Sequence, residues 1–317
     1  MMKALLKDDT SVSVKNVAKP VLRSNGDVLI CIHLAGLCRT DVFVAEGKIK
    51  GKPDLVLGHE FSGIIEAAGN DARGFQPGDK VTVMPVIPCG TCPLCTTGKE
   101  DMCQNTTMLG IEHDGAFAEY ISVPAAAVYK LPENVPFDMG AYSEPVAAAL
   151  SVMKSGIRPG EKGLIYGDNR FGHLIDRILK AYDFKDVTIY DPRHNTTLDE
   201  SAYDFAIETM ANEKIMEDIF RAVKPGGRVV LKSRKHDSVG INFNAAIKKE
   251  LTLSAVNYGD FNEAIRLMAE GRLQVDDLLG DVYDLEDFAE VFERSKTHEE
   301  KKIFFRPRRE DNHVRDC

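Results

Sequence analysis

The chain has 317 residues, of which 44% are hydrophobic and 28% are charged, and its formal net charge is −9. This length predicts two domains, and the acidic balance argues against a nucleic-acid partner, which needs a basic face to neutralise phosphates. No apolar run approaches the roughly 20 residues of a membrane span, and "MMKALLKDD" becomes charged too early for a secretion signal. We therefore expect a cytoplasmic protein with no membrane partner.

The first part of the chain, up to about residue 146, is rich in strand and turn patterns. Segments 27–36 and 79–86 have the composition of strands, and turn residues gather at 23–26 and 75–79. The pattern changes near residue 146, where alanines and a leucine recur at helical spacing until Gly156. This change predicts a domain boundary.

Four of the seven cysteines stand within "CGTCPLCTTGKEDMC": Cys89, Cys92, Cys95 and Cys103. Two-residue gaps let neighbouring thiolates converge on one ion, and four thiolates complete the tetrahedral coordination of zinc. Such a site is structural, because it leaves no position for substrate. An iron–sulfur cluster is the alternative, but a ferredoxin motif has its fourth cysteine three residues further on and a proline after it.

From residue 162 onward, strand patterns alternate with helix patterns. We predict strands at 162–167, 186–191, 202–210 and 226–233, and helices at 171–184 and 212–227. This alternation is typical of a parallel, doubly wound sheet. Helices are also predicted at 261–270 and 286–296, before a polar tail from residue 306 that we expect to be mobile. Segment 251–256 is either an edge strand that pairs across a dimer or an internal strand.

Scattered residues of metal-binding type suggest a second zinc site: Cys38, His59, Glu60 and Glu144. Catalytic zinc takes three protein ligands of mixed type and keeps a fourth position for water or substrate. A single buried cysteine or histidine is more often part of a core. The joint occurrence with the four-cysteine segment and a following strand–helix–strand unit favours the metal site.

Six stretches resemble the zinc-dependent medium-chain dehydrogenase/reductase superfamily, in the order of that family: "GLCRTDV", "LGHEFSGIIEAAG", "PGDKVTVMPVIPCGTCPLCTTGKEDMC", "DGAFAEYISVP", "SEPVAAAL" and "VKPGGRVVL". The "GHE" and the later "EP" resemble the polyol, threonine and sugar-alcohol dehydrogenase branch. The resemblance implies an α/β protein with a β-rich, GroES-like catalytic domain at 1–146 and 258–317. Its shortened Rossmann-like domain, with a doubly wound parallel sheet for the cofactor, would occupy 147–257.

The resemblance also implies a role for each candidate residue. Cys38 and His59 would bind the catalytic zinc, with Glu60 or Glu144 as the carboxylate ligand, and Thr40 would accept the proton of the substrate hydroxyl.

Two neighbouring residues have implied roles as well. Asp41 would orient the ligating histidine, and Arg39 would reach the cofactor pyrophosphate. Each is also an ordinary residue for an exposed turn or surface. Phe43 stands where the family has a proton-relaying histidine.

The expected dinucleotide loop, "GDNRFG", departs from the G-x-G-x-x-G pattern. Gly167 and Gly172 are present, but Asn169 replaces the middle glycine; we expect it to keep the turn because asparagine tolerates left-handed backbone angles. Asp191 closes the second strand, at the position where an acid binds the ribose 2′-hydroxyl, so we expect NAD rather than NADP. Arg193 and His194 leave NADP open, and the domain lacks roughly thirty residues of the family pattern.

The implied reaction is hydride transfer between a secondary alcohol (a polyol, an amino alcohol or a sugar-derived alcohol) and NAD(P). We expect two zincs per chain, one catalytic and one structural, a small-molecule alcohol or ketone as substrate, and a homodimer or tetramer. Two other functions stay open. One is a zinc-bearing scaffold or binding protein that has lost dinucleotide binding, and the other is a zinc enzyme without net nicotinamide turnover.

Overall fold

The computed structural model describes residues 1–9, 11–234, 238–297 and 301–308. The chain divides into two compact units, Met1–Glu144 with the residues from Asp276 onward, and Pro145–Val275. The sequence-based division assigned residues 258–275 to the first unit, whereas the contacts place them in the second. Two hydrogen bonds hold them there: Gly259 N donates to Ala147 O over 2.7 Å, and the Tyr182 hydroxyl donates to Glu263.

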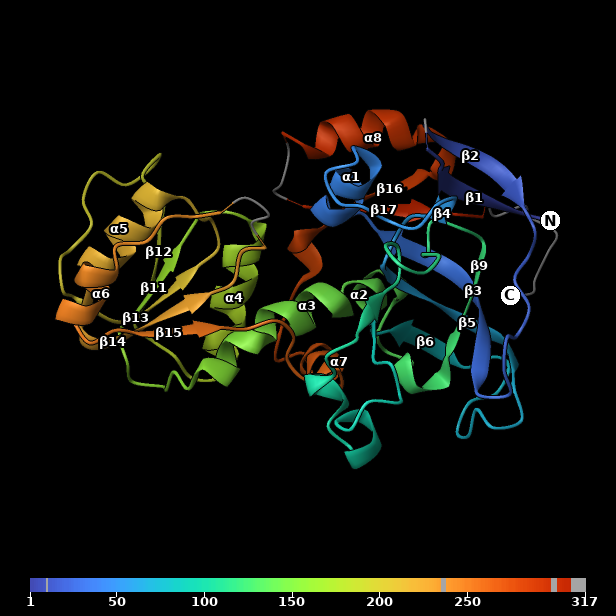
Figure 1. Cartoon of the computed structure of the whole chain (residues 1–317), viewed down its shortest axis with the longest axis horizontal. Helices are drawn as coiled ribbons and strands as arrows, with labels where there is room; N and C mark the ends of the chain where they lie inside the picture. Colours follow the sequence, from blue (N-terminus) through green and yellow to red (C-terminus); the bar gives the residue numbers. More distant parts are fainter. Residues whose placement is uncertain (10, 235–237, 298–300, 309–317) are drawn as a thin grey trace. The chain divides into compact units, whose positions relative to one another are not determined.

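The first unit is built on β-sheets (Figure 1). A small sheet has the order β2-β1-β4, with β1 Met2–Lys7, β2 Val12–Val17 and β4 Leu55–Val56. The large sheet has the order β10-β6-β5-β3-β17-β16, with β9 also paired to β3. Its strands are β3 Asp27–Gly36, β5 Glu60–Ala68, β6 Lys80–Val83, β9 Tyr120–Pro124, β10 Val128–Lys130, β16 Leu279–Asp284 and β17 Lys302–Arg306. A further pair joins β7 Val86–Ile87 to β8 Thr107–Met108.

Strand β3 is the centre of the first unit. It pairs antiparallel with β5, β9 and β17, and its apolar side chains, such as Val28 and Ile30, are fully buried in the core. Strand β17 brings a distant part of the chain back to this centre, where Phe304 pairs with Gly36. The helices of this unit are α1 Arg39–Ala45, α2 Phe137–Ala141 and α8 Phe288–Ser295, while α3 Ser143–Leu150 continues into the second unit.

The second unit contains a five-stranded parallel sheet in the order β12-β11-β13-β14-β15. Its strands are β11 Gly163–Tyr166, β12 Val187–Tyr190, β13 Tyr203–Glu208, β14 Val223–Leu231 and β15 Thr252–Ala255. Its helices are α4 Arg170–Ala181, α5 Glu213–Ala222, α6 Phe243–Lys248 and α7 Phe261–Ala269. Across the sheet, the chain moves from β11 to β12 on one side and from β13 to β14 on the other. Right-handed crossovers therefore put α4 and α5 on opposite faces of the sheet, as Figure 1 shows. The predicted α/β class with a doubly wound sheet is confirmed.

The sheet is shorter than a full doubly wound sheet, whose strand order is 3-2-1-4-5-6. The order observed corresponds to 2-1-4-5-6. Residues 191–202, all of them described, join β12 to β13 without a helix or strand. Strand β12 is therefore an edge strand, which agrees with the shortened domain expected from the sequence.

Several element boundaries differ from the prediction. The helix predicted over 212–227 ends at Ala222, because Pro225 and the left-handed Gly226 (φ 75°) do not continue a helix, and β14 begins at once. Helix α6 was not predicted. Most of the tail predicted to be mobile lies outside the described residues. Among the described helices, none is long and apolar enough to cross a membrane.

Candidate functional site

The four clustered cysteines converge in the segment between β7 and β8. All four sulfur atoms lie within 4.8 Å of one another, and four pairs lie 3.5 to 4.0 Å apart: Cys92–Cys95, Cys103–Cys89, Cys92–Cys103 and Cys89–Cys95. Four thiolates about 2.3 Å from one tetrahedral ion would lie about 3.8 Å apart, so the residues fit zinc without rearrangement. An iron–sulfur cluster fits less well, because its cysteines ligate separate irons and their sulfurs stand further apart.

The thiols of this cluster differ in acidity. Backbone N–H groups of Thr91 and Cys92 lower the pKa of Cys89 to about 6, which favours the thiolate that a metal requires. Burial, together with the neighbouring thiols, raises the pKa of Cys95 to about 12. Loading of the cluster with a metal ion therefore displaces a proton from Cys95 at neutral pH.

A second metal-type group forms around the buried carboxylate of Asp41. Cys38 is the N-cap of α1, and its backbone N–H donates to Asp41 Oδ2 over 2.9 Å. Asp41 Oδ1 accepts from Gly58 N at 3.2 Å and from His59 Nδ1 at 2.9 Å. One carboxylate thus ties the start of α1 to the two residues that precede β5. The aspartate expected to orient the histidine lies where that role requires it.

The ligand atoms of Cys38, His59 and Glu60 lie within 4.8 Å of one another. His59 is fully buried, and its Nε2 has no hydrogen-bond partner among the described residues. Burial lowers the pKa of His59, but Asp41 and Cys38 outweigh it, so the pKa is raised well above the ordinary value. An orphaned imidazole nitrogen facing a thiol and a carboxylate is costly without a partner and fits a metal ion.

The carboxylate of Glu60 is controlled by a residue that the sequence patterns did not reveal. Lys302, at the start of β17, forms an ion pair with Glu60, and both side chains are buried. A side chain at Gly36 would lie 2.6 Å from Lys302 Cε, so the absence of one makes room for the pair. Burial raises the pKa of Glu60; Lys302 opposes the rise, and the nearby Glu144 adds to it. The only sequence signal for Lys302 is a lysine at the head of an apolar strand.

The other predicted residues of this site are not members of the metal-type group. Thr40 is half-buried on α1, and Arg39 is exposed at the first position of that helix. Glu144 is buried in the first turn of α3 and acts on Glu60 through its charge.

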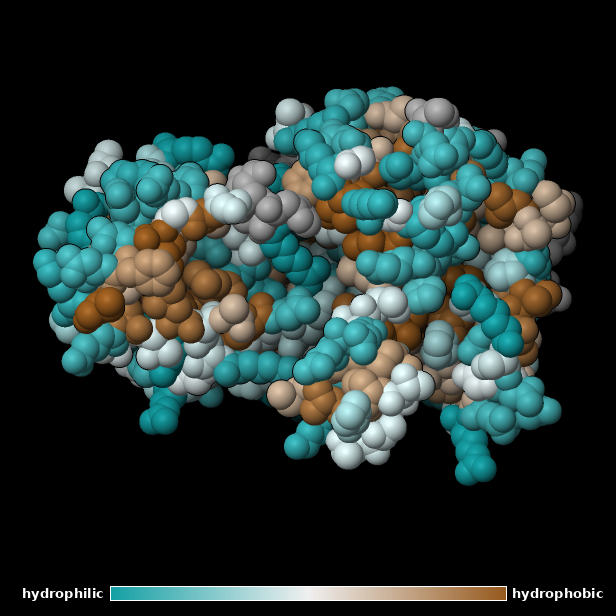
Figure 2. All heavy atoms as spheres, viewed as in Figure 1, coloured by the Kyte–Doolittle hydropathy of each residue, from teal (hydrophilic) through white to brown (hydrophobic). Residues whose placement is uncertain are grey.

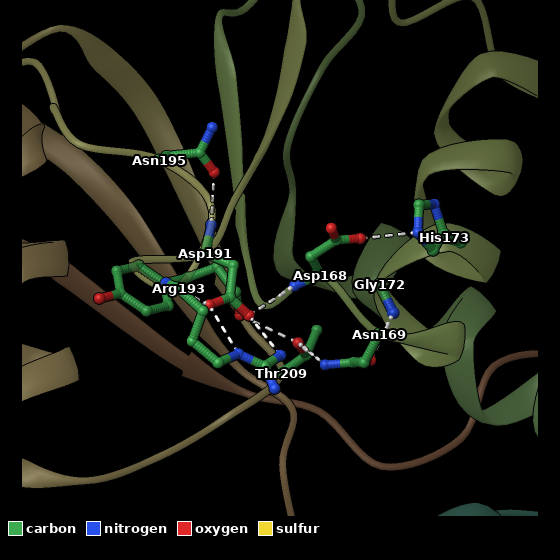
Figure 3. A network of polar contacts seen from close by, with 9 residues as sticks. Asp168, Asn169, Gly172, His173, Asp191, Arg193, Asn195 and Thr209 are labelled. Carbon is green, nitrogen blue, oxygen red and sulfur yellow. Dashed lines mark hydrogen bonds and ion pairs between the residues drawn. The ribbon is translucent and has the colours of Figure 1, made fainter. Parts of the chain in front are cut away.

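The predicted dinucleotide loop connects β11 to α4 (Figure 3). Gly167 adopts a positive φ of 127°, and a side chain there would meet Thr209 Oγ1 at 2.2 Å. A side chain at Gly172 would meet Gly167 O at 2.4 Å, so both glycines permit close packing of strand, loop and helix. The expected left-handed turn at Asn169 is wrong: its φ is −145°, because its side chain caps α4 and accepts from Gly172 N.

Asn169 and Asp168 are both engaged within the loop region. Asn169 Nδ2 donates to Thr209 Oγ1 at 3.0 Å, and Asp168 Oδ1 pairs with His173 Nε2 at 2.8 Å. Asp191, expected to face the cofactor ribose, is fully buried and paired with Arg193. The structure therefore brings the loop residues and Asp191 together, but with their polar groups turned to one another.

Comparison with known proteins agrees with this geometry. Residues 24–133 match the family model described as alcohol dehydrogenase GroES-like domain, and residues 175–301 match that of zinc-binding dehydrogenase. The chain is 29% identical to an L-threonine 3-dehydrogenase of Pyrococcus furiosus, over 88% of this chain and 91% of that protein. It is 27% identical to D-xylulose reductase A of Aspergillus oryzae, over 87% and 88%.

A solved structure is also similar. It is a Sinorhizobium meliloti protein described as a zinc-binding dehydrogenase and bound to NADP, with a TM-score of 0.88 and 27% identity over 97% of this chain and 99% of that chain. The GroES-like and Rossmann-like assignments of the two units are confirmed by these matches.

The Lys302–Glu60 pair generates the first prediction. Lys302→Met leaves the Glu60 carboxylate buried without its cation, and we expect a loss of about 3 kcal/mol in the free energy of unfolding. Denaturant unfolding monitored by circular dichroism measures it. The neighbouring exposed Lys301→Met is the control and should stay within about 0.5 kcal/mol of the wild type. The double variant Lys302→Met/Glu60→Gln should recover part of the loss, and a fully stable single variant would contradict the account.

Proposed function

The chain belongs to the zinc-dependent medium-chain dehydrogenase superfamily, and on that premise we propose that it transfers a hydride between a secondary alcohol and a nicotinamide cofactor. The observation that carries the proposal is the group of Cys38, His59 and Glu60 with the unpartnered His59 Nε2. Relatives named for xylulose and threonine support a polyol or amino alcohol as substrate, and a sugar-derived alcohol is of the same class.

We assign two zincs to each chain, a structural ion in the four-cysteine cluster and a catalytic ion at Cys38, His59 and Glu60. When bound, the catalytic ion supplies Lewis-acid polarisation of the alcohol oxygen and lowers the pKa of the alcohol. Asp41 holds His59 so that Nε2 faces the ion. Thr40 Oγ1 would accept the hydroxyl proton of the substrate while its own hydroxyl proton passes to water.

The two carboxylates of the site have different roles in this proposal. Glu60 belongs to the group and Glu144 does not, so Glu60 is the ligand, while Glu144 adjusts its charge. Because Lys302 also attracts the Glu60 carboxylate, a bound ion would share that carboxylate with the lysine. A carboxylate attracted from both sides would leave the ion more readily and would open a position for substrate.

The second unit binds the nicotinamide dinucleotide in this proposal. The close packing at Gly167 and Gly172 fits the strand–loop–helix that takes a pyrophosphate. The NADP bound to the Sinorhizobium meliloti relative supports this assignment. We also propose a cytoplasmic location, where the thiolate ligands of such a cluster are kept reduced.

One observation favours a second function. Asn169 closes its loop by capping α4 and bonding Thr209, which removes donors that a pyrophosphate would use. A chain with this closed loop could serve as a zinc-bearing scaffold that has lost dinucleotide binding.

A combined titration tests these alternatives. We expect purified protein to contain two zincs per chain and to bind NADH or NADPH with micromolar affinity, as followed by nicotinamide fluorescence. His59→Ala should contain one zinc and lose alcohol oxidation, while His113→Ala, whose ring bonds Thr107, should keep both zincs. Two zincs with no dinucleotide binding would contradict the oxidoreductase proposal and favour zinc chemistry without nicotinamide; one zinc with no dinucleotide binding would favour the scaffold.

The thiol acidities generate a pH prediction for the structural ion. The raised pKa of Cys95 means that zinc must displace its proton, so zinc affinity should rise with pH between 6 and 8. We expect about a tenfold gain per pH unit for each proton released. Competition with a chelator in the His59→Ala protein isolates the four-cysteine cluster, and an affinity that does not change with pH would be inconsistent with this prediction.

We further propose a homodimer formed through β15. Within the described residues β15 pairs only with β14, so its outer edge can pair with a second copy. Phe243 and Ile247 on α6 are each 71% exposed, and Figure 2 shows hydrophobic side chains gathered over this part of the second unit. Large exposed apolar side chains are typical of a protein interface, and these two lie on the helix that precedes β15 in the chain.

The dimer is tested by sedimentation velocity. The variant Phe243→Lys/Ile247→Lys should sediment as a monomer at micromolar concentration, because it places like charges in the interface. Val21→Lys, which replaces a 74% exposed residue of the first unit, should remain dimeric. A wild-type protein that is monomeric throughout would refute the proposal.

A further inference from the structure

Asp191 follows the edge strand β12, at the position where an acid would bind the ribose 2′-hydroxyl of NAD. Here both of its carboxylate oxygens already have donors (Figure 3). Oδ1 accepts from Arg193 N at 2.9 Å and from Arg193 Nε at 3.0 Å. Oδ2 accepts from Arg193 Nη2 at 2.7 Å and from Asp168 N at 3.4 Å. The carboxylate is a structural anchor between the loop and the turn.

The burial of Asp191 agrees with this role. The side chain is 0% exposed, and its hydrogen bonds with Arg193 lower its pKa to about 2. A ribose hydroxyl could reach the carboxylate only by displacing the guanidinium, which would leave a buried charge without its cation. The geometry therefore argues against the sequence-based preference for NAD.

Unlike Asp191, Arg193 is exposed to solvent. Its side chain is 62% exposed although two of its donor groups are held by Asp191. A guanidinium has five N–H donors in a planar fork, so the clamped side chain still presents donors to solvent. Fixing the fork in advance reduces the entropy lost when it binds a phosphate.

The Arg193 guanidinium lies where the 2′-phosphate of a bound NADP would be expected. The backbone N–H of Asp168, in the loop expected to face the pyrophosphate, bonds the same carboxylate that holds Arg193. The cation is thus tied to the phosphate loop at the end of β12, where the adenosine ribose of a bound dinucleotide lies. A 2′-phosphate there would meet the guanidinium, whereas a 2′-hydroxyl would find the acid occupied.

We propose that Arg193 is the specificity-determining residue of the cofactor site and that the chain selects 2′-phosphorylated nucleotides, NADP(H) over NAD(H). This inference rests on the proposed function of the second unit. Asp191 is a positioning residue that acts through Arg193.

The test compares affinities for NADPH and NADH by nicotinamide fluorescence, and for 2′,5′-ADP and 5′-AMP by calorimetry. We expect the wild type to bind each 2′-phosphorylated ligand at least about tenfold more tightly than its partner. Arg193→Ala should remove this difference by weakening only the 2′-phosphorylated ligands. Arg193→Lys should keep part of it, and His194→Ala, which alters the adjacent exposed side chain, should keep all of it.

The outcomes separate the two proposals. Equal or tighter binding of NADH by the wild type, or an unchanged preference in a folded Arg193→Ala protein, would overturn this inference alone. If neither dinucleotide binds, the oxidoreductase proposal fails, and 2′,5′-ADP still decides the inference: binding that depends on Arg193 supports it, and absent binding overturns it. Circular dichroism establishes whether each variant is folded. If Arg193→Ala is unfolded, the affinities of Arg193→Lys provide the comparison instead.

Discussion

The metal-type group of the first unit depends on one buried carboxylate, that of Asp41. It accepts hydrogen bonds from the backbone of Cys38 and Gly58 and from the ring of His59, residues that precede α1 and β5. A buried anion is costly unless several donors satisfy it, and these three donors also fix its geometry. With Nδ1 committed to Asp41, the histidine can offer only Nε2 to an ion, on the side where Cys38 and Glu60 lie.

The second unit also contains a buried carboxylate that is held by several donors. Asp191 is buried at the end of an edge strand and joins the phosphate loop to the turn that carries Arg193. In both units a carboxylate sets the direction of a neighbouring side chain: the sequence predicts this role for Asp41, whereas it predicts direct cofactor binding for Asp191. The groups that would meet ligand are the imidazole in one unit and the guanidinium in the other.

The sequence predicts much of this molecule, because some features are local. The spacing of the four cysteines, the alternation of strands and helices, and the missing segment after β12 can all be read from residues close in the chain. Lys302 could not be predicted, since it reaches Glu60 only through the pairing of β17 with β3 across more than half of the chain. The conformation of Asn169 was mispredicted because backbone tolerance says nothing about a side chain that prefers to cap a helix.

The central claim is that Cys38, His59 and Glu60 share an ion held open for substrate, and anomalous diffraction at the zinc absorption edge tests it most directly. The account predicts two peaks per chain, one among the four cysteine sulfurs and one beside Cys38 Sγ and His59 Nε2. A single peak, in the cysteine cluster only, with the imidazole nitrogen bonded to water or to protein instead, would contradict it.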